Sequence, residues 1–397
     1  MKRITKWLAA FSMLAIVFSS VQLSPAYAVP SYPSWAEVQA AKKKVSAKKA
    51  LIAKLEKYIE DLQDEVDRLS KIALQQAEVF NQAEEAYQEI KVKVDNLQSQ
   101  VDQATAQADQ ATRQLGQLAA QMYRDGAAGT SVNFFLNADK ADDLLYQLGQ
   151  QNKLAQQSDT IYQRAVAKQR LAQSLADQLE VAKKELKVKA DAAKSAFDTA
   201  SNAAANVQDK VDESNRLNKT FYAQLAVLRD TSATLERQRA EGLAAEARQN
   251  RGRKMPDSPA LYSVKDPNSA KVEKAIAFAR EQLGERYVLG GMGPNVWDCS
   301  GITKAAYASA GIYIGTHSAT NQFRTMGYKR KLVPVKQAQR GDLMWYSQES
   351  YFDGDKYHVV MYLGGGMMLE APFPARPVRI VPVRYGELFP YAGRPSA

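Results

Sequence analysis

The sequence predicts an α+β protein in which a long antiparallel helical hairpin precedes a smaller mixed domain. An apolar repeat with a period of 3.5 residues runs through residues 52–122, and glycines at Gly126 and Gly129 follow it. Four short strand-like runs come after residue 340. Because two domains are the expected number for 397 residues, we interpret the helical part and the strand-containing part as separate domains.

Residues 1–28 have the three parts of a secretory signal peptide. Lys2, Arg3 and Lys6 give a positive start, an apolar run continues to about Leu23, and the sequence Ala-Tyr-Ala ends at Ala28. An uncleaved membrane anchor is the alternative, because the apolar run is nearly long enough to span a bilayer. Anchors do not need an Ala-x-Ala ending, so we expect cleavage after Ala28 and a secreted, cell-wall-associated protein.

The chain is basic, with a formal net charge of +10. Removing the three cations of residues 1–28, which contain no acid, leaves +7. Export argues against nucleic acid as a partner, whereas an anionic cell envelope attracts a basic protein. The alternative is that the charge only keeps the protein soluble.

The first long helix is predicted by apolar residues that alternate in steps of three and four from Ile52 to Met122. Among these 21 positions only Gln76 is polar, and the residues between them are largely Gln, Lys, Asp and Glu. This repeat specifies a left-handed coiled coil rather than a globular helix. A weaker repeat resumes at Leu154 and continues to about Leu228, so the two helices are expected to pair as an antiparallel hairpin.

The tip of this hairpin carries two aromatic residues, Phe134 and Phe135. With arms of about 130 Å at 1.5 Å per residue, the tip is expected to lie far from the C-terminal domain. Exposed aromatic side chains there are a candidate docking site for a partner. The alternative is that they only cap the apolar core of the rod.

The composition changes after Leu243, where clustered cations, glycine and two prolines indicate a linker. The predicted organisation is therefore a signal peptide, a coiled-coil domain, a linker and a C-terminal domain, over residues 1–28, 29–250, 251–269 and 270–397. The last segment is long enough for one compact domain.

Cys299 is the only cysteine of the chain. In an exported protein an unpaired cysteine indicates an intermolecular bridge or a reactive thiol. It lies in the sequence Asp-Cys-Ser-Gly, after a glycine-rich loop and before a predicted helix that ends near Gly311. A helix N-terminus favours thiolate over thiol, so this position suits a nucleophile.

A histidine and a carboxylate are expected to meet on a β-hairpin. His358 begins one strand-like run, Gly364-Gly365-Gly366 form a turn, and Glu370 ends the next run. Folding at the glycines brings His358 into the neighbourhood of Glu370. Helices are predicted over residues 271–283 and near Ile302, and strands over 341–346, 358–363, 367–371 and 378–383.

These residues predict a thiol acyl-transfer site. Cys299 is expected to attack a carbonyl, His358 to hold the thiolate as an ion pair and protonate the leaving amine, and Glu370 to orient the imidazole. The further candidates for oxyanion or substrate contacts are the backbone N–H of Cys299 and the side chains of Tyr287, Ser300 and Ser318. His317, in a predicted polar loop, is interpreted as a surface residue. One cysteine and two histidines cannot make the usual structural zinc sites, so no metal or cofactor is expected.

Four separate motifs resemble the NlpC/p60 family of papain-like peptidoglycan endopeptidases, and they occur in the order typical of that family. They are Tyr287-x-x-Gly290-Gly291, Asp298-Cys299-Ser300-Gly301, Gly341-Asp342-Leu343 and His358-Val-x-x-Tyr-Leu-Gly364. The resemblance covers about residues 270–397. It implies hydrolysis within the peptidoglycan stem peptide, most often between D-glutamate and diaminopimelate, with Cys299 as nucleophile, His358 as base and Glu370 as the third polar residue.

Three departures from the family pattern concern substrate preference. Glu370 stands where many members have histidine, and in this respect the sequence resembles the actinobacterial division hydrolases. Leu289 stands where an aromatic residue is common, and residues 347–357 form a long acidic and aromatic insertion.

The helical half is similar to division hydrolases that dock on the FtsEX transporter-like complex. This suggests that the rod holds the peptidase inactive until its tip, at Phe134 and Phe135, meets a membrane partner. A noncatalytic wall-binding scaffold, or an amidase or acyltransferase on the same fold, is the alternative function.

Overall fold

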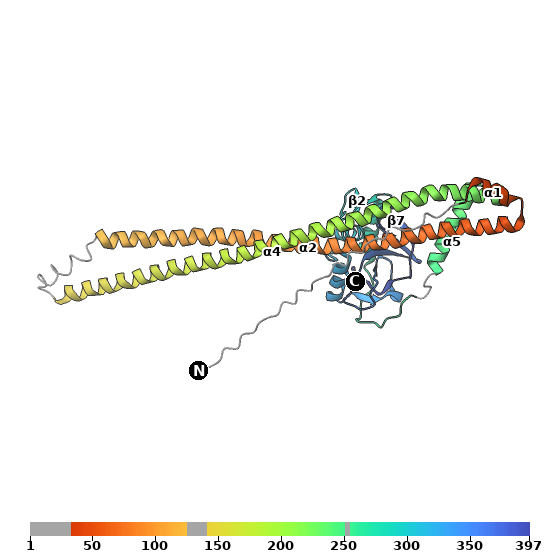
Figure 1. Ribbon diagram of the computed structural model, residues 1–397. Coiled ribbons are helices and arrows are strands. Elements are labelled where there is room, and N and C mark those ends of the chain that lie inside the picture. Colours follow the sequence, from red (N-terminus) through yellow and green to blue (C-terminus); the bar gives the residue numbers. More distant parts are fainter. Residues whose placement is uncertain (1–32, 125–140, 251–254) are drawn as a thin grey trace, which may run out of the picture.

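The computed structural model describes residues 33–124, 141–250 and 255–397. Two long antiparallel helices form a rod, and a smaller domain lies against one part of it (Figure 1). The rod extends beyond this domain toward residues 124 and 141 (Figure 1). Within the described residues, no helix combines the length and apolar character needed to cross a membrane. The predicted α+β architecture is confirmed.

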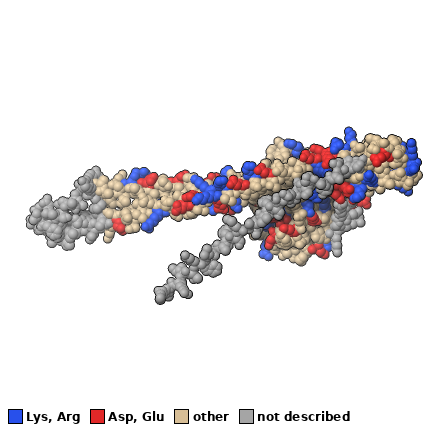
Figure 2. Space-filling model, viewed as in Figure 1, with Lys and Arg blue, Asp and Glu red and all other residues tan. Residues whose placement is uncertain are grey.

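The rod consists of α2 (Val45–Arg124) and α4 (Ala141–Arg229), which have 80 and 89 residues. At 1.5 Å per residue they are about 120 and 130 Å long. Leu62, Val66 and Val94 lie at positions of the predicted repeat and are buried. Figure 2 shows positive and negative side chains interspersed along the visible face of the rod, as expected for solvent-facing positions. The predicted pair of long antiparallel helices is therefore present.

Two shorter helices close the end of the rod opposite to residues 124 and 141. α1 (Trp35–Lys42) begins at a capping box made by Ser34 and Glu37. α5 (Ala233–Asn250) is separated from α4 by a sharp turn, in which Asp230 has a φ of 57°. The predicted repeat ends near Leu228, where α4 ends, whereas the turn and the separate helix α5 are findings of the structure.

The C-terminal domain is built on a six-stranded sheet in the order β3-β8-β4-β5-β6-β7. All neighbouring strands of this sheet are antiparallel. Its strands are β3 (Leu332–Pro334), β4 (Leu343–Tyr346), β5 (His358–Gly364), β6 (Met367–Glu370), β7 (Arg379–Pro382) and β8 (Leu388–Gly393). The other elements are α6 (Ser269–Glu281), α7 (Cys299–Ser309), α8 (Ala319–Tyr328), a 3₁₀ turn η1 (Val335–Gln337) and the parallel pair β1 (Arg286–Tyr287) and β2 (Val296–Trp297).

The four predicted strands correspond to β4, β5, β6 and β7, and the predicted helices to α6 and α7. The sequence interpretation did not include β8, whose Pro390 is unfavourable inside a strand. The register between β4 and β8 shifts between Met344 and Tyr346, so Pro390 lies at an irregularity where a ladder hydrogen bond is not required. The sequence interpretation also did not include α8, and described the first residues of this helix as a polar loop.

The domain packs directly against the rod. Leu74 of α2 belongs to the same buried apolar cluster as Cys299 and Trp297. On the neighbouring surface, Phe373 packs against a cluster that includes Val207 of α4. The active-site face of the domain, defined here as the surface formed by Tyr287, Cys299, Ser300 and Ser318, is therefore the face on which α2 lies.

Candidate active site

Cys299 is the first residue of α7, as the sequence predicted. Asp298 caps this helix, because its Oδ1 accepts a hydrogen bond from the Gly301 N–H at 2.7 Å. A Cβ at Gly301 would lie 2.0 Å from the carbonyl oxygen of Gly291, so only glycine fits where the loop passes the helix. The Asp-Cys-Ser-Gly motif is thus a helix start that fixes the position of the thiol.

The thiol of Cys299 is held in its neutral form in this structure. Burial raises the pKa of Cys299 well above its usual value, and the nearby charge of Asp298 raises it further. Cys299 is only 5% exposed. Burial in this form of the protein therefore acts against the thiolate that a helix N-terminus favours.

His358 and Glu370 are in direct contact, as the predicted hairpin required. His358 Nε2 lies 2.9 Å from Glu370 Oε2, and both side chains are fully buried. The carboxylate accepts the Nε2 proton, so Nδ1 is the nitrogen that remains able to take a proton. Among the described residues Nδ1 has no hydrogen-bond partner. The Val359 backbone N–H donates to the Cys299 sulfur, which places the thiol beside the start of β5.

Two arginines hold Glu370. Arg379, the cross-strand neighbour of Glu370 on β7, donates from Nε and Nη2 to Oε1 at 3.0 and 2.9 Å. Arg384 donates from Nη1 to Oε1 at 2.9 Å and from Nη2 to Oε2 at 2.8 Å. Although burial opposes ionisation, these cations and the His358 hydrogen bond keep the pKa of Glu370 well below its usual value. The third polar residue is therefore an ionised carboxylate with a fixed orientation.

The same arginines act against a charged imidazole. Burial is the largest cause that lowers the pKa of His358, and the charges of Arg384 and Arg379 lower it further against the opposite effect of Glu370. These effects favour the neutral imidazole of His358, and the thiolate–imidazolium pair stays a prediction. The arrangement suits an imidazole that takes the thiol proton during attack.

The remaining predicted residues also lie on the active-site face. Tyr287 is buried, and burial together with the charge of Asp298 raises its pKa well above the usual value, so its hydroxyl stays protonated. Ser300 Oγ donates to Asp298 Oδ1 at 3.1 Å. Ser318 caps α8 by accepting from the Asn321 N–H.

His317 is not the surface residue that the sequence suggested. Its Nε2 lies 2.8 Å from Asp298 Oδ1, and its side chain is 14% exposed. It therefore steadies the carboxylate that caps α7. His317 does lie in the loop before α8, as predicted, but its contact with Asp298 was not visible in the sequence.

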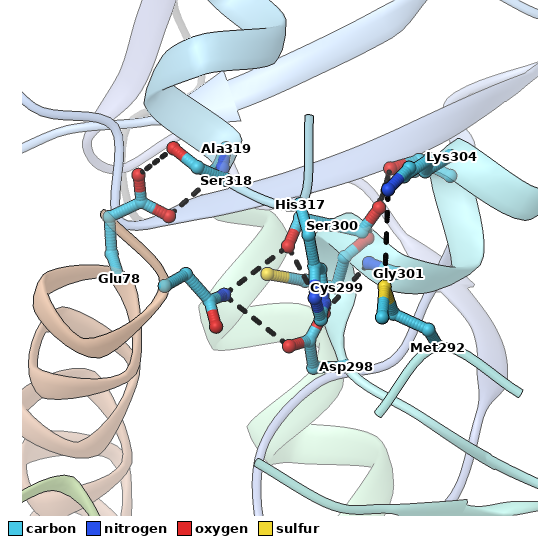
Figure 3. Close-up of polar contacts among 12 residues, drawn as sticks. Glu78, Met292, Asp298, Cys299, Ser300, Gly301, Lys304, His317, Ser318 and Ala319 are labelled. Atoms are coloured by element: carbon cyan, nitrogen blue, oxygen red, sulfur yellow. Dashed lines mark hydrogen bonds and ion pairs between the residues drawn. The ribbon is translucent and has the colours of Figure 1, made fainter. Parts of the chain in front are cut away.

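Three polar residues of α2 reach the active-site face, which the coiled-coil pattern did not indicate. Figure 3 shows Glu78 pointing from α2 toward Ser318 and Ala319. Asn81 Nδ2 donates to Asp298 Oδ2 and Ser300 Oγ, each at 3.4 Å. Gln82 Nε2 donates to Thr320 Oγ1 at 3.2 Å. The helix therefore covers the face that a substrate must reach.

Two further predictions concern the hairpin tip and the absence of a metal site. The tip residues Phe134 and Phe135 lie outside the described residues. Over the described part of the chain, no group of three or more His, Cys, Asp or Glu side chains is arranged to hold a metal ion.

Residues 284–388 match the NlpC/P60 family. The C-terminal domain is an NlpC/P60 domain. NlpC/P60 peptidoglycan endopeptidases are cysteine peptidases, and Cys299, His358 and Glu370 all fall within the matched range. The resemblance seen in the sequence motifs is thereby confirmed for this domain.

The chain is similar to curated mycobacterial proteins over this domain. It is 35% identical over 136 residues to peptidoglycan endopeptidase RipB of Mycobacterium tuberculosis, a match that covers 31% of this chain and 52% of RipB. Peptidoglycan endopeptidase RipA of Mycolicibacterium smegmatis is 34% identical over 136 residues, which covers 31% of this chain and 25% of RipA. The chain thus spans about half of RipB and a quarter of RipA.

A solved structure of the peptidoglycan hydrolase RipB from Mycobacterium tuberculosis is 29% identical in sequence. The match covers 40% of this chain and 86% of that structure, with a TM-score of 0.29.

Proposed function

We propose that this chain is a secreted cysteine endopeptidase that hydrolyses a peptide bond in the stem peptide of peptidoglycan. The observation that carries the proposal is the contact of His358 with the ionised Glu370 beside Cys299, inside an NlpC/P60 domain. The names of RipA and RipB as peptidoglycan endopeptidases support the substrate class. We propose the bond between D-glutamate and diaminopimelate, and a role in cell-wall remodelling or the separation of daughter cells.

The proposed reaction starts from neutral groups. The thiol of Cys299 gives its proton to Nδ1 of His358 while the sulfur attacks the carbonyl carbon, and the backbone N–H of Cys299 and the Tyr287 hydroxyl stabilise the oxyanion. The C–N bond then breaks, and the imidazolium returns the proton to the leaving amine. Water attacks the thioester with His358 as base, the C–S bond breaks, and the proton restores the thiol.

Digestion of defined muropeptides tests this function. We expect the mature chain, once active, to release products cut at the glutamyl bond, and Cys299→Ala to release none. Unchanged products from Cys299→Ala would remove the nucleophile. Cleavage of a sugar–peptide amide, or transfer of the acyl group to an amine, would instead indicate an amidase or acyltransferase, and wall binding without products would indicate a scaffold.

We also propose that residues 29–250 regulate the domain at residues 270–397. Support comes from Glu78, Asn81 and Gln82 of α2, which bond to the active-site face. Activation then requires that the rod leaves the active-site face. We propose that an FtsEX-type membrane complex removes the rod by binding the hairpin tip at Phe134 and Phe135.

Comparing the mature chain with its part from residue 256 onward tests this regulation. We expect the shorter chain to cleave purified peptidoglycan at least tenfold faster. Equal rates, with both chains folded by circular dichroism, would exclude inhibition by the rod.

A further inference from the structure

The end of the rod that α1 and α5 close carries a run of lysines. Residues 33–57, which we call the basic end of the rod, contain seven lysines and two acids, Glu37 and Glu56. The segment therefore has a net charge of seven minus two, or +5. Figure 2 shows Lys and Arg side chains at this end of the molecule, where α1 lies in Figure 1. The lysines are Lys42, Lys43, Lys44, Lys48, Lys49, Lys54 and Lys57.

Three of these lysines have no acidic partner. Lys43, Lys44 and Lys49 are exposed, and none of them forms an ion pair with any other residue that the structure describes. Nearby, Asp230 is shared by Lys42 and Lys48, at 2.9 and 3.7 Å. Like charges on one surface repel one another, so such a run costs free energy unless an external anion meets it.

Elsewhere on the rod, several exposed lysines are paired with acids on the same helix. Lys187 and Lys194 each contact the aspartate four residues later, at 3.1 and 2.8 Å. Lys184 contacts Glu180 at 2.7 Å. Such pairs are typical of the solvent-facing positions of a coiled coil. The concentration of lysines without acids is therefore a property of the basic end and not of the rod as a whole.

Two apolar side chains are exposed among these lysines. Trp35 is 47% exposed and Val45 is 73% exposed. Trp35 and Lys42 are the first and last residues of α1, about two turns apart, so they lie on the same side of this helix, while Val38 packs into the rod. Val45 is the first residue of α2 and directly follows Lys44. Tryptophan and aliphatic side chains beside several lysines are typical of segments that bind at the interface of a lipid bilayer.

We propose that the basic end of the rod binds an anionic phospholipid surface. The lysines contact the phosphate head groups, and Trp35 and Val45 enter the boundary between the head groups and the acyl chains. A soluble polyanion would use the lysines but would leave the two apolar side chains without a role. The contact lies at the end of the rod opposite to residues 124 and 141, so it is separate from the proposed docking of the tip and does not depend on the peptidase function.

Binding of the mature chain, residues 29–397, to lipid vesicles tests this proposal. The probes are vesicles of phosphatidylglycerol with phosphatidylcholine and vesicles of phosphatidylcholine alone. We expect the chain to sediment with the anionic vesicles only, and to bind them less tightly as the salt concentration rises, because salt screens exposed charges. Tryptophan fluorescence should shift to shorter wavelength on binding and report on Trp35, since Trp297 and Trp345 are buried.

Two variants and a matched control separate the contributions. Lys43→Glu/Lys44→Glu should weaken binding to the anionic vesicles by about tenfold or more, because two attractive charges become repulsive. Trp35→Ala should weaken binding severalfold and abolish the fluorescence shift. The control Lys183→Glu/Lys184→Glu makes the same change in net charge at exposed positions of α4 and should bind as the parent chain does. Circular dichroism checks that each variant keeps its helices.

Three results would overturn the proposal. The first is equal binding to vesicles with and without phosphatidylglycerol, and the second is an equal loss of binding in the two pairs of reversed lysines. The third is binding to poly(glycerol phosphate), which has phosphates but no acyl chains, that is as tight as binding to the anionic vesicles and leaves the fluorescence of Trp35 unchanged. That result would assign the basic end to an anionic wall polymer instead.

Discussion

At the residue scale, the electrostatics of the site depend on Glu370 and its two arginines. Glu370 accepts hydrogen bonds from His358, Arg379 and Arg384 at the same time. It therefore orients the imidazole, while the two arginines oppose the effect of its negative charge on the pKa of His358. A neutral imidazole is the form needed to accept the thiol proton. The arginines are thus positioning residues whose effect is exerted through Glu370.

Replacing Arg384 by glutamine should move the pH profile of the isolated domain. Loss of this cation raises the pKa of His358, because Arg384 lowers it in the native site. Since the neutral imidazole is active, the acid limb of kcat/KM should shift upward by about one pH unit, or about 1.4 kcal/mol. The control is Arg340→Gln, which removes an exposed pair with Glu273. An unmoved acid limb, or the same shift in the control, would contradict this role.

A second prediction concerns the glycine after the nucleophile. In Gly301→Ala the new methyl group meets the Gly291 carbonyl oxygen, so the loop or α7 must move. Overpacking of this kind costs about 1–3 kcal/mol, and the melting temperature of the domain should fall by several degrees with loss of activity. Gly386→Ala, in the turn between β7 and β8 where nothing lies within 4 Å, should leave the melting temperature of the domain unchanged or slightly raised. Equal melting temperatures for both variants would refute the steric argument.

Cys299 and His358 could be identified from the sequence because cysteine and histidine are rare in this chain. Cys299 is the only cysteine, and the glycine turn before Glu370 made its approach to His358 predictable. Arg379 and Arg384 gave no such signal, because their contacts depend on the register of β6 and β7 and on the loop that follows. Glu78 occupies an outer position of a coiled-coil repeat, where glutamate normally faces solvent.

At the element scale, α4 supports the part of α2 that covers the site. Val207 of α4 is fully buried in a cluster with Val66 and Ala73 of α2, and Phe373 of the domain packs on the same cluster. Helix α2 is therefore held on the domain partly through its partner helix. Sequence periodicity predicted the pairing of the helices but not this three-way contact, because the contact joins side chains more than 130 positions apart in the sequence.

Val207→Asp should therefore release the domain from the rod. An unpaired buried carboxylate costs several kcal/mol, so the helices should separate locally and the full chain should cleave peptidoglycan faster by about tenfold. Val188→Asp, at a position that is 65% exposed on the same helix, should change neither the rate nor the sensitivity of the rod to limited proteolysis. Similar rates for the two variants would show that α4 does not contribute to inhibition.

At the scale of the whole molecule, we expect the proposed closure of the rod on the domain to depend on the protonation of Glu78. Burial in the closed form raises the pKa of Glu78 from 4.5 to about 7, although its hydrogen-bond donors act in the opposite direction. Released into solvent, the same carboxylate returns to its ordinary pKa. Between about pH 4.5 and 7 the closed form therefore binds a proton that the open form does not, so acid favours closure and a rise in pH favours opening.

The ratio of full-chain activity to that of Glu78→Gln should consequently increase with pH across this window. The variant provides the reference because Cys299 and His358 are present in both chains, whereas glutamine at position 78 carries no ionisable group. We expect the ratio to be smallest near pH 5 and to rise severalfold by pH 8, measured as initial rates on one acidic muropeptide in buffers of constant ionic strength. A ratio independent of pH would mean that Glu78 keeps its charge in the closed form, with its four donors, including Gln82, outweighing the cost of burial.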